Sequence, residues 1–177
     1  MTYFILLLIA TLVMTSLGSP AASERILIFR SIEDTSTPPD ESFCGTAPFA
    51  PNVLLGASLW SIQTQASDAM IVNGQVRRIG NATACTRITN FAFPPFTTTV
   101  PFYVSFDLED GQYVGLGDCT ITSNSMPADR LILAGCSLNL TTVPPDVIGG
   151  AATSLSVFNP FRLPGFGTES IWTLRLY

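Results

Sequence analysis

The chain has 177 residues, of which 47% are hydrophobic and only 12% are charged, a composition typical of a compact fold rather than a disordered segment. Its net charge is −5, with 13 acidic side chains against 8 basic ones, which excludes the basic surface that nucleic-acid-binding proteins need. Histidine and lysine are both absent, which excludes catalytic triads, imidazole acid–base chemistry, the usual zinc sites and lysine Schiff bases. We therefore predict no metal and no cofactor.

The N-terminus carries a mostly apolar run over residues 3–17. Such a run is shorter than the about 20 residues that span a bilayer, and it is typical of a signal-peptide core. The small residues Ala21, Ala22 and Ser23 follow, and they predict cleavage before Glu24. We expect a signal peptide at 1–23, secretion to an extracellular or periplasmic space, and no stable membrane insertion after cleavage. An uncleaved anchor is the alternative.

The mature chain is expected to begin with a short strand at residues 25–29. Residues 33–52 are rich in proline and acidic side chains and show no periodicity, which predicts an irregular loop. We accordingly divide the mature chain into an N-terminal strand and acidic loop at 24–52 and a β-barrel domain at 53–177.

Strand and turn signals alternate through the rest of the chain. Asn73-Gly74 and Asp110-Gly111 stand between strand-like runs and predict two-residue hairpin turns. The strand-like runs lie at residues 53–65, 70–72, 75–77, 83–89, 102–108, 112–122, 130–140, 152–158 and 170–177. Short strands joined mainly by hairpins predict an all-β fold, an antiparallel up-and-down barrel of about eight strands, with a β-sandwich as the alternative.

Four cysteines, Cys44, Cys85, Cys119 and Cys136, predict two disulfides in an oxidising compartment, with three possible pairings. A hairpin whose loop is centred between residues 126 and 129 pairs residues whose numbers add up to about 255. This register places Cys119 opposite Cys136 and leaves Cys44 to pair with Cys85.

Several segments beyond Gly80 are similar in outline to those of the allene oxide cyclase and dirigent-type barrels: IGNATAC, YVSFDLEDGQYVGLGDC, LILAGCSL, IGGAATS and IWTLRLY. The shared features are a glycine-rich strand, a strand–DG–strand hairpin, a GG-containing segment and an apolar last strand. The resemblance covers about the last 100 residues, while the disulfides and the acidic loop depart from it. It implies an eight-stranded barrel with an apolar interior pocket and implies no activity.

Three groups of side chains are candidate sites. Asp107, Glu109 and Asp118 could form an acid–base pair or a Ca²⁺ site, or simply decorate a hairpin tip. Five phenylalanines near prolines could form an aromatic lip for a ligand, or pack over a barrel end; they are Phe91, Phe93, Phe96, Phe161 and Phe166. Asn81 and Asn139 begin glycosylation sequons, and Asn81 is preferred because Asn139 falls on a predicted strand.

Three functions remain open. The leading hypothesis is a secreted disulfide-bonded barrel that binds a small hydrophobic ligand, or the surface of a protein partner, without catalysis. The second is a structural or envelope-associated interaction protein without a pocket. The third is an enzyme, either cyclase-like or a carboxylate hydrolase. An oligomer is compatible with all three.

Overall fold

The computed structural model describes residues 24–62, 77–89, 98–125 and 129–177. The predicted signal peptide at 1–23, the Asn73-Gly74 turn and three lip residues (Phe91, Phe93 and Phe96) lie outside this described part. The eight strands are β1 (Arg25–Glu33), β2 (Val53–Ser61), β3 (Arg78–Thr86), β4 (Thr99–Leu108), β5 (Gly111–Ser123), β6 (Ile132–Thr142), β7 (Gly150–Phe158) and β8 (Glu169–Leu176). One short helix, α1 (Glu41–Cys44), follows β1.

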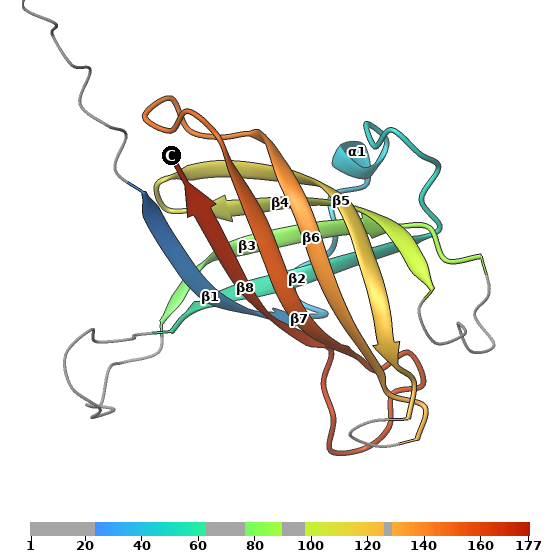
Figure 1. The fold of residues 1–177 in the computed structure, drawn as a ribbon. Coiled ribbons are helices and arrows are strands. Elements are labelled where there is room, and N and C mark those ends of the chain that lie inside the picture. Colours follow the sequence, from blue (N-terminus) through green and yellow to red (C-terminus); the bar gives the residue numbers. More distant parts are fainter. Residues whose placement is uncertain (1–23, 63–76, 90–97, 126–128) are drawn as a thin grey trace, which may run out of the picture.

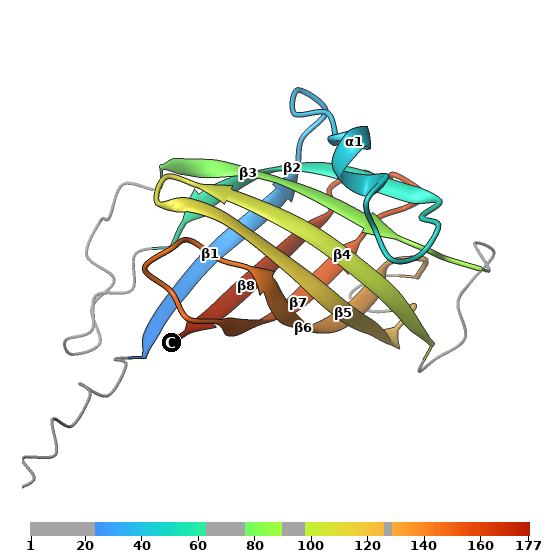
Figure 2. The same ribbon diagram turned by 90° about the horizontal axis from the view of Figure 1, so that it is seen from above.

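The strands form a closed barrel in which each pairs with its neighbour in sequence order, and every pairing is antiparallel. The ring closes where β1 pairs with β8, from Arg25 opposite Leu176 to Ile32 opposite Glu169. Figures 1 and 2 show the tilted strands wrapping around one axis. The prediction of an all-β, antiparallel up-and-down barrel is confirmed, and the sandwich alternative is not what the chain forms.

The barrel begins earlier than the sequence division at residue 53 suggested. Because β1 pairs with both β2 and β8, the N-terminal strand is part of the closed sheet. Of the segment 24–52, residues 34–52 lie outside the barrel wall. The hairpin between β4 and β5 is confirmed, but its turn lies one residue earlier than predicted. Gly111 has a φ of 140°, which glycine tolerates, and it pairs with Leu108 instead of forming the tip.

Both disulfides are those predicted from the register. Cys119 faces Cys136 across β5 and β6, and the residue numbers of facing pairs add up to 255 from Gly115–Leu140 to Ile121–Ala134. The bridges are Cys119–Cys136 and Cys44–Cys85, and no cysteine is free.

The acidic strap, defined as residues 34–52, crosses the outer face of β2 and β3 (Figure 2). Asp34 accepts hydrogen bonds from Ser36 Oγ (2.7 Å) and Ser58 Oγ (2.7 Å), and these bonds hold the pKa of its carboxyl well below the usual range. The Asp40 amide donates to Thr83 Oγ1 at 3.0 Å. The strap is therefore attached to the barrel along its length.

The middle of the strap is fixed by three further contacts. The Asp40 carboxylate caps α1 by accepting from the amides of Ser42 and Phe43, and the disulfide to β3 follows directly at Cys44. The Phe43 ring stacks on Tyr103 of β4 with centroids 4.5 Å apart. Gly56 of β2 lies beneath the strap, where a Cβ atom would stand only 1.8 Å from the Thr37 carbonyl oxygen.

The barrel end where β1 begins is filled by side chains. Phe29, Phe106 and Trp172 pack edge to face in the interior, and Leu174 and Tyr113 beside them are fully buried. These residues belong to one apolar cluster that fills the interior here, and we call this the closed end of the barrel. A wider space of about 860 Å³ also lies at this end, between the first half of β1, the ends of β2 and β4, the start of β3 and the β4–β5 turn.

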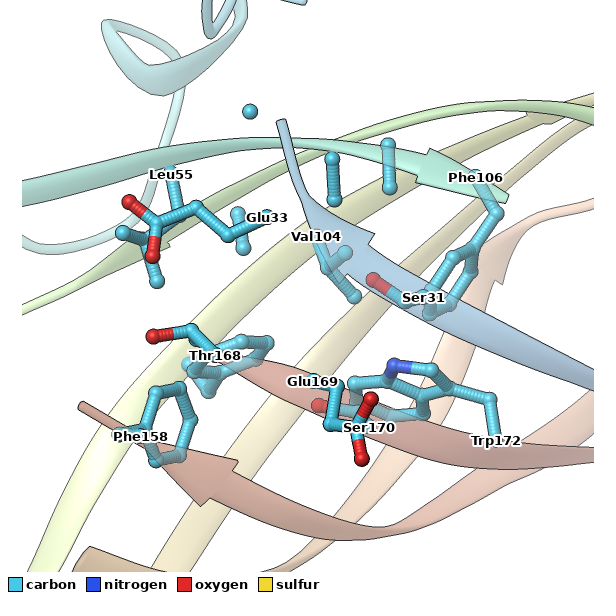
Figure 3. A pocket seen from close by; sticks show the side chains of 15 residues that line it. Ser31, Glu33, Leu55, Val104, Phe106, Phe158, Thr168, Glu169, Ser170 and Trp172 are labelled. Carbon is cyan, nitrogen blue, oxygen red and sulfur yellow. The ribbon is translucent and has the colours of Figure 1, made fainter. Parts of the chain in front are cut away.

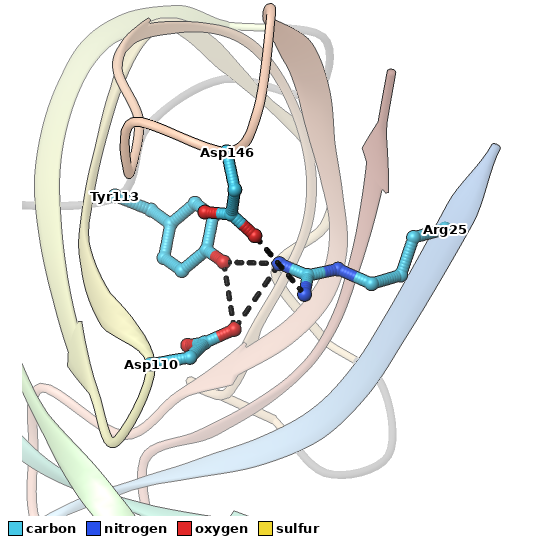
Figure 4. A network of polar contacts seen from close by, with 4 residues as sticks. All are labelled: Arg25, Asp110, Tyr113 and Asp146. Carbon is cyan, nitrogen blue, oxygen red and sulfur yellow. Dashed lines mark hydrogen bonds and ion pairs between the residues drawn. The ribbon is translucent and has the colours of Figure 1, made fainter. Parts of the chain in front are cut away.

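A polar network lies over the closed end (Figure 4). Arg25 donates to the Tyr113 hydroxyl (2.6 Å) and to Asp110 (3.1 Å), and the hydroxyl donates to Asp110 at 2.9 Å. Asp146 lies 4.0 Å from the same guanidinium. Burial, reinforced by Asp110, raises the pKa of Tyr113 to about 12.

Among the described residues, no helix is long and apolar enough to cross a membrane.

A candidate ligand cavity at the open end of the barrel

The opposite end of the barrel holds a cavity of about 200 Å³, which we call the mouth cavity. It lies where β1, β3, β5 and β7 end and where β2, β4, β6 and β8 begin. Its apolar walls are formed by Val53, Leu55, Ile88, Val100, Phe102, Ile121, Ile132, Ala134 and Phe158. The barrel interior is thus packed around Phe106 and Trp172 and hollow at the mouth.

A smaller chamber of about 40 Å³, the inner chamber, lies deeper and shares five lining residues with the mouth cavity. Figure 3 shows the side chains around it. Ala57, Ala82 and Ala84 line it from β2 and β3, and Phe106 and Trp172 line it from β4 and β8. Because these alanine side chains are small, the aromatic side chains that share the chamber with them do not fill the interior here.

Most polar side chains at the mouth are already hydrogen-bonded within the protein. Thr86 Oγ1 donates to the Pro101 carbonyl at 2.7 Å, and Thr168 Oγ1 accepts from the Asn159 amide at 3.1 Å. The Asn159 side chain is buried; its Nδ2 donates to the Leu163 and Phe166 carbonyls, and its Oδ1 accepts from the Leu163 amide. These groups therefore stabilise the rim and leave an apolar surface toward the cavity.

One ion pair faces the mouth cavity. Glu33 is the last residue of β1, and strand alternation from buried Phe29 through Ser31 directs it inward. Arg162, on the connection between β7 and β8, places its Nη2 atom 3.2 Å from Glu33 Oε1. The side chain of Glu33 is 22% exposed and that of Arg162 is 73% exposed. The carboxylate is thus largely shielded, while the guanidinium extends toward solvent.

A second, polar space of about 150 Å³ adjoins the same ion pair, and we call it the annex. Glu33 and Arg162 line both the annex and the mouth cavity, as do Asn159 and Thr168. The open end therefore combines an apolar space with a polar one, and the Glu33–Arg162 pair lies between them.

Of the three predicted acidic residues, Asp118 lies apart from the other two. Asp107 is exposed on β4 and accepts hydrogen bonds from Gln112 (2.9 Å) and a serine of the same strand. Glu109 lies in the β4–β5 turn, where hydrogen bonds from Arg77 lower its carboxyl pKa. Asp118 is exposed on β5, six positions along the strand from Gln112, which corresponds to about 20 Å. None of the three lines the mouth cavity.

Two of the predicted lip residues are described, and both lie on the β7–β8 connection at the open end. Phe166 is 43% exposed and lines the annex. Phe161 is 44% exposed, and the Arg130 guanidinium lies 5.8 Å from its ring centroid. Both are near the mouth, and neither lines the mouth cavity itself.

Both sequon asparagines are exposed on strands, Asn81 on β3 and Asn139 on β6. The sequence-based preference for Asn81 therefore has no structural basis, because neither residue lies in a loop. Asn81 Oδ1 also accepts a hydrogen bond from Arg78.

Sequence reasoning missed the Glu33–Arg162 pair. The composition of residues 33–52 predicts a loop that begins at Glu33. Strand alternation continued from Phe29 by two steps places Glu33 inward instead. Nothing local to Arg162 indicates its partner, because the contact joins residues 129 positions apart.

No family model, curated protein or solved structure matches this chain. Within the described ranges, no cluster of three or more acidic or cysteine side chains could hold a metal ion.

Proposed function

We propose that this protein binds a small, mostly apolar molecule in the mouth cavity and does not transform it. The observation that supports this proposal is the mouth cavity itself: the packed side chains of the barrel interior end below it and leave a hollow with apolar walls. The wider space at the other end is bordered by the exposed Arg77–Glu109 pair instead. A structural protein without a pocket has no need of such a hollow end.

The size of the cavity limits the ligand. A cavity of about 150 Å³ lined by aliphatic and aromatic side chains holds benzene. By that standard the mouth cavity, at about 200 Å³, holds a molecule of about eight or nine non-hydrogen atoms. Ligands of this size bind with a Kd of about 0.1–1 mM when apolar contact dominates.

The chemistry of the mouth supports binding rather than catalysis. Carboxylate hydrolysis uses two converging carboxyl groups, and Glu33 is the one carboxylate among the described residues that line the mouth cavity. That carboxylate is already paired with Arg162. A cyclase-like activity, the other enzymatic possibility, finds no support in this arrangement.

We also propose that the barrel works outside the cytosol, in an extracellular or periplasmic space. The two disulfides support an oxidising compartment. N-terminal sequencing of protein secreted by a host expressing residues 1–177 tests this, and we expect the sequence to begin at Glu24.

Isothermal titration with 2-phenylethanol tests the binding proposal, using the mature chain and two alanine variants. Ala134 lines the mouth cavity and is 1% exposed, so Ala134→Leu occupies the space that the ligand needs and weakens binding at least about tenfold. Ala151 faces outward on β7 between Asn139 and Arg175, so Ala151→Leu is the matched control and retains wild-type binding. Equal binding by all three proteins would refute the mouth cavity as the site.

A further inference from the structure

We propose that the ligand of the mouth cavity is an uncharged amphiphile whose hydroxyl head binds between Glu33 and Arg162. This inference rests on the proposed function, and it adds the chemical class of the ligand. The apolar body occupies the mouth cavity and the hydroxyl points toward the annex.

The position of the ion pair defines where a head group must lie. Glu33 and Arg162 line the apolar mouth cavity and the polar annex alike. A molecule whose apolar part fills the mouth cavity therefore presents its outer end to these two side chains. The other polar groups shared by the two spaces, Asn159 and Thr168, are hydrogen-bonded within the β7–β8 connection.

Both members of the pair have hydrogen-bonding capacity to spare. In the described part of the chain, the Glu33 side chain accepts one hydrogen bond, from Arg162 Nη2 at 3.2 Å. A carboxylate can accept about four hydrogen bonds and a guanidinium can donate five. A hydroxyl donates to the carboxylate and accepts from the guanidinium, so it satisfies both groups at once.

The charge of the pair selects against charged heads. Glu33 and Arg162 together are neutral, and the Glu33 side chain is only 22% exposed. A carboxylate head that approaches Arg162 also approaches Glu33, and an ammonium head that approaches Glu33 also approaches Arg162. Because like charges repel strongly where water is partly excluded, either charged head is disfavoured relative to a hydroxyl.

The test compares four compounds that share one phenyl body: 2-phenylethanol, phenylacetate, 2-phenylethylammonium and ethylbenzene. Affinities are measured by isothermal titration at pH 7 with wild-type protein. We expect 2-phenylethanol to bind at least about tenfold more tightly than either charged compound, and more tightly than ethylbenzene.

Two variants are then expected to change which head group binds most tightly. Glu33→Gln leaves the Arg162 charge unpaired, so phenylacetate becomes the tightest ligand. Arg162→Gln leaves the Glu33 charge unpaired, so 2-phenylethylammonium becomes the tightest ligand. Opposite shifts in the two variants cannot arise from a loss of folding. The matched controls are Glu109→Gln and Arg77→Gln, because this Arg–Glu pair lies exposed at the closed end, and both controls retain the wild-type order.

The outcomes separate the two proposals. If none of the four compounds binds, the proposed function fails and this inference fails with it. If ethylbenzene or a charged compound binds wild-type protein as tightly as 2-phenylethanol, the proposed function stands and the hydroxyl-head inference is overturned. An unchanged order of affinities in both mouth variants also overturns it.

Discussion

The attachment of the acidic strap can be tested by adding one methyl group at Gly56. A Cβ atom there would lie 1.8 Å from the Thr37 carbonyl oxygen, and ordinary contact begins at 3.4 Å, so the strap must retreat by 3.4 − 1.8 = 1.6 Å. The obstacle is backbone, and the strap is held on either side by Ser58, Thr83 and the disulfide to Cys85. Overpacking of this kind costs about 1–3 kcal/mol.

Gly135→Ala is the matched control for Gly56→Ala. A Cβ atom at Gly135 of β6 would meet only the Ser154 carbonyl oxygen, at 3.7 Å, so this methyl group fits. Alanine lowers the conformational entropy of the unfolded chain to a similar extent in both variants. This effect favours folding by about 0.5–1 kcal/mol. Because that gain cancels between the two variants, we expect Gly56→Ala to be about 1–3 kcal/mol less stable to unfolding than Gly135→Ala.

Thermal unfolding monitored by circular dichroism, with the disulfides intact, measures this difference. A gap of about 2 kcal/mol corresponds to about 4–8 °C in Tm for a domain of about 150 residues. Equal Tm values for the two variants would refute the placement of the strap on β2.

Three further changes probe the disulfide and the two perturbed ionisable groups. Replacing both Cys119 and Cys136 by alanine opens a loop with a sequence separation of 17. We expect the free energy of unfolding, measured by urea titration, to fall by about 3 kcal/mol. A loss below about 1 kcal/mol contradicts the entropic argument. Because the pKa of Tyr113 rises from 10.0 to about 12 on folding, the stability that its neutral phenol contributes is complete below pH 10 and is lost as the pH rises to about 12. Tyr113→Phe flattens this alkaline decline in guanidinium midpoints, and an identical decline in both proteins assigns it elsewhere. The pKa of Asp34 is lower in the folded state than its ordinary 3.8, so its contribution is present above about pH 4 and is lost as the pH falls through the folded pKa. Asp34→Asn therefore shows a shallower acid loss than wild type, and a steeper one would be inconsistent with the sign.

The fold was predictable because local signals and global topology agree. Short strands separated by turn residues predict hairpins, and consecutive hairpins can close into a ring without long crossings. The register of the β5–β6 hairpin followed from its loop alone and correctly paired Cys119 with Cys136. The place of β1 did not follow, because its pairing with β8 joins the two ends of the chain.

The site was less predictable because its residues are far apart in the sequence and because it consists of volume that side chains leave unfilled. The mouth cavity exists because small side chains such as Ala134 face larger ones across the barrel, and volume left unfilled has no local sequence signature. The density of acidic residues around Asp107 predicts a site there, yet the described carboxylate that lines the mouth cavity belongs to Glu33. Phe166 lies near the mouth because the proline-flanked loop that carries it is at the open end, but its role as a ligand lip stays a prediction.

A methyl NMR titration with 2-phenylethanol tests the ligand cavity most directly. The methyl groups of Val100, Ile121 and Ile132 line the mouth cavity, whereas Leu174 and Leu176 are buried and lie outside its lining. We predict saturable shifts for the first three methyl-bearing residues, with one shared Kd, and no shift for the two leucines. Shifts confined to other parts of the barrel, or no saturable shift at all, would contradict a ligand site at the open end.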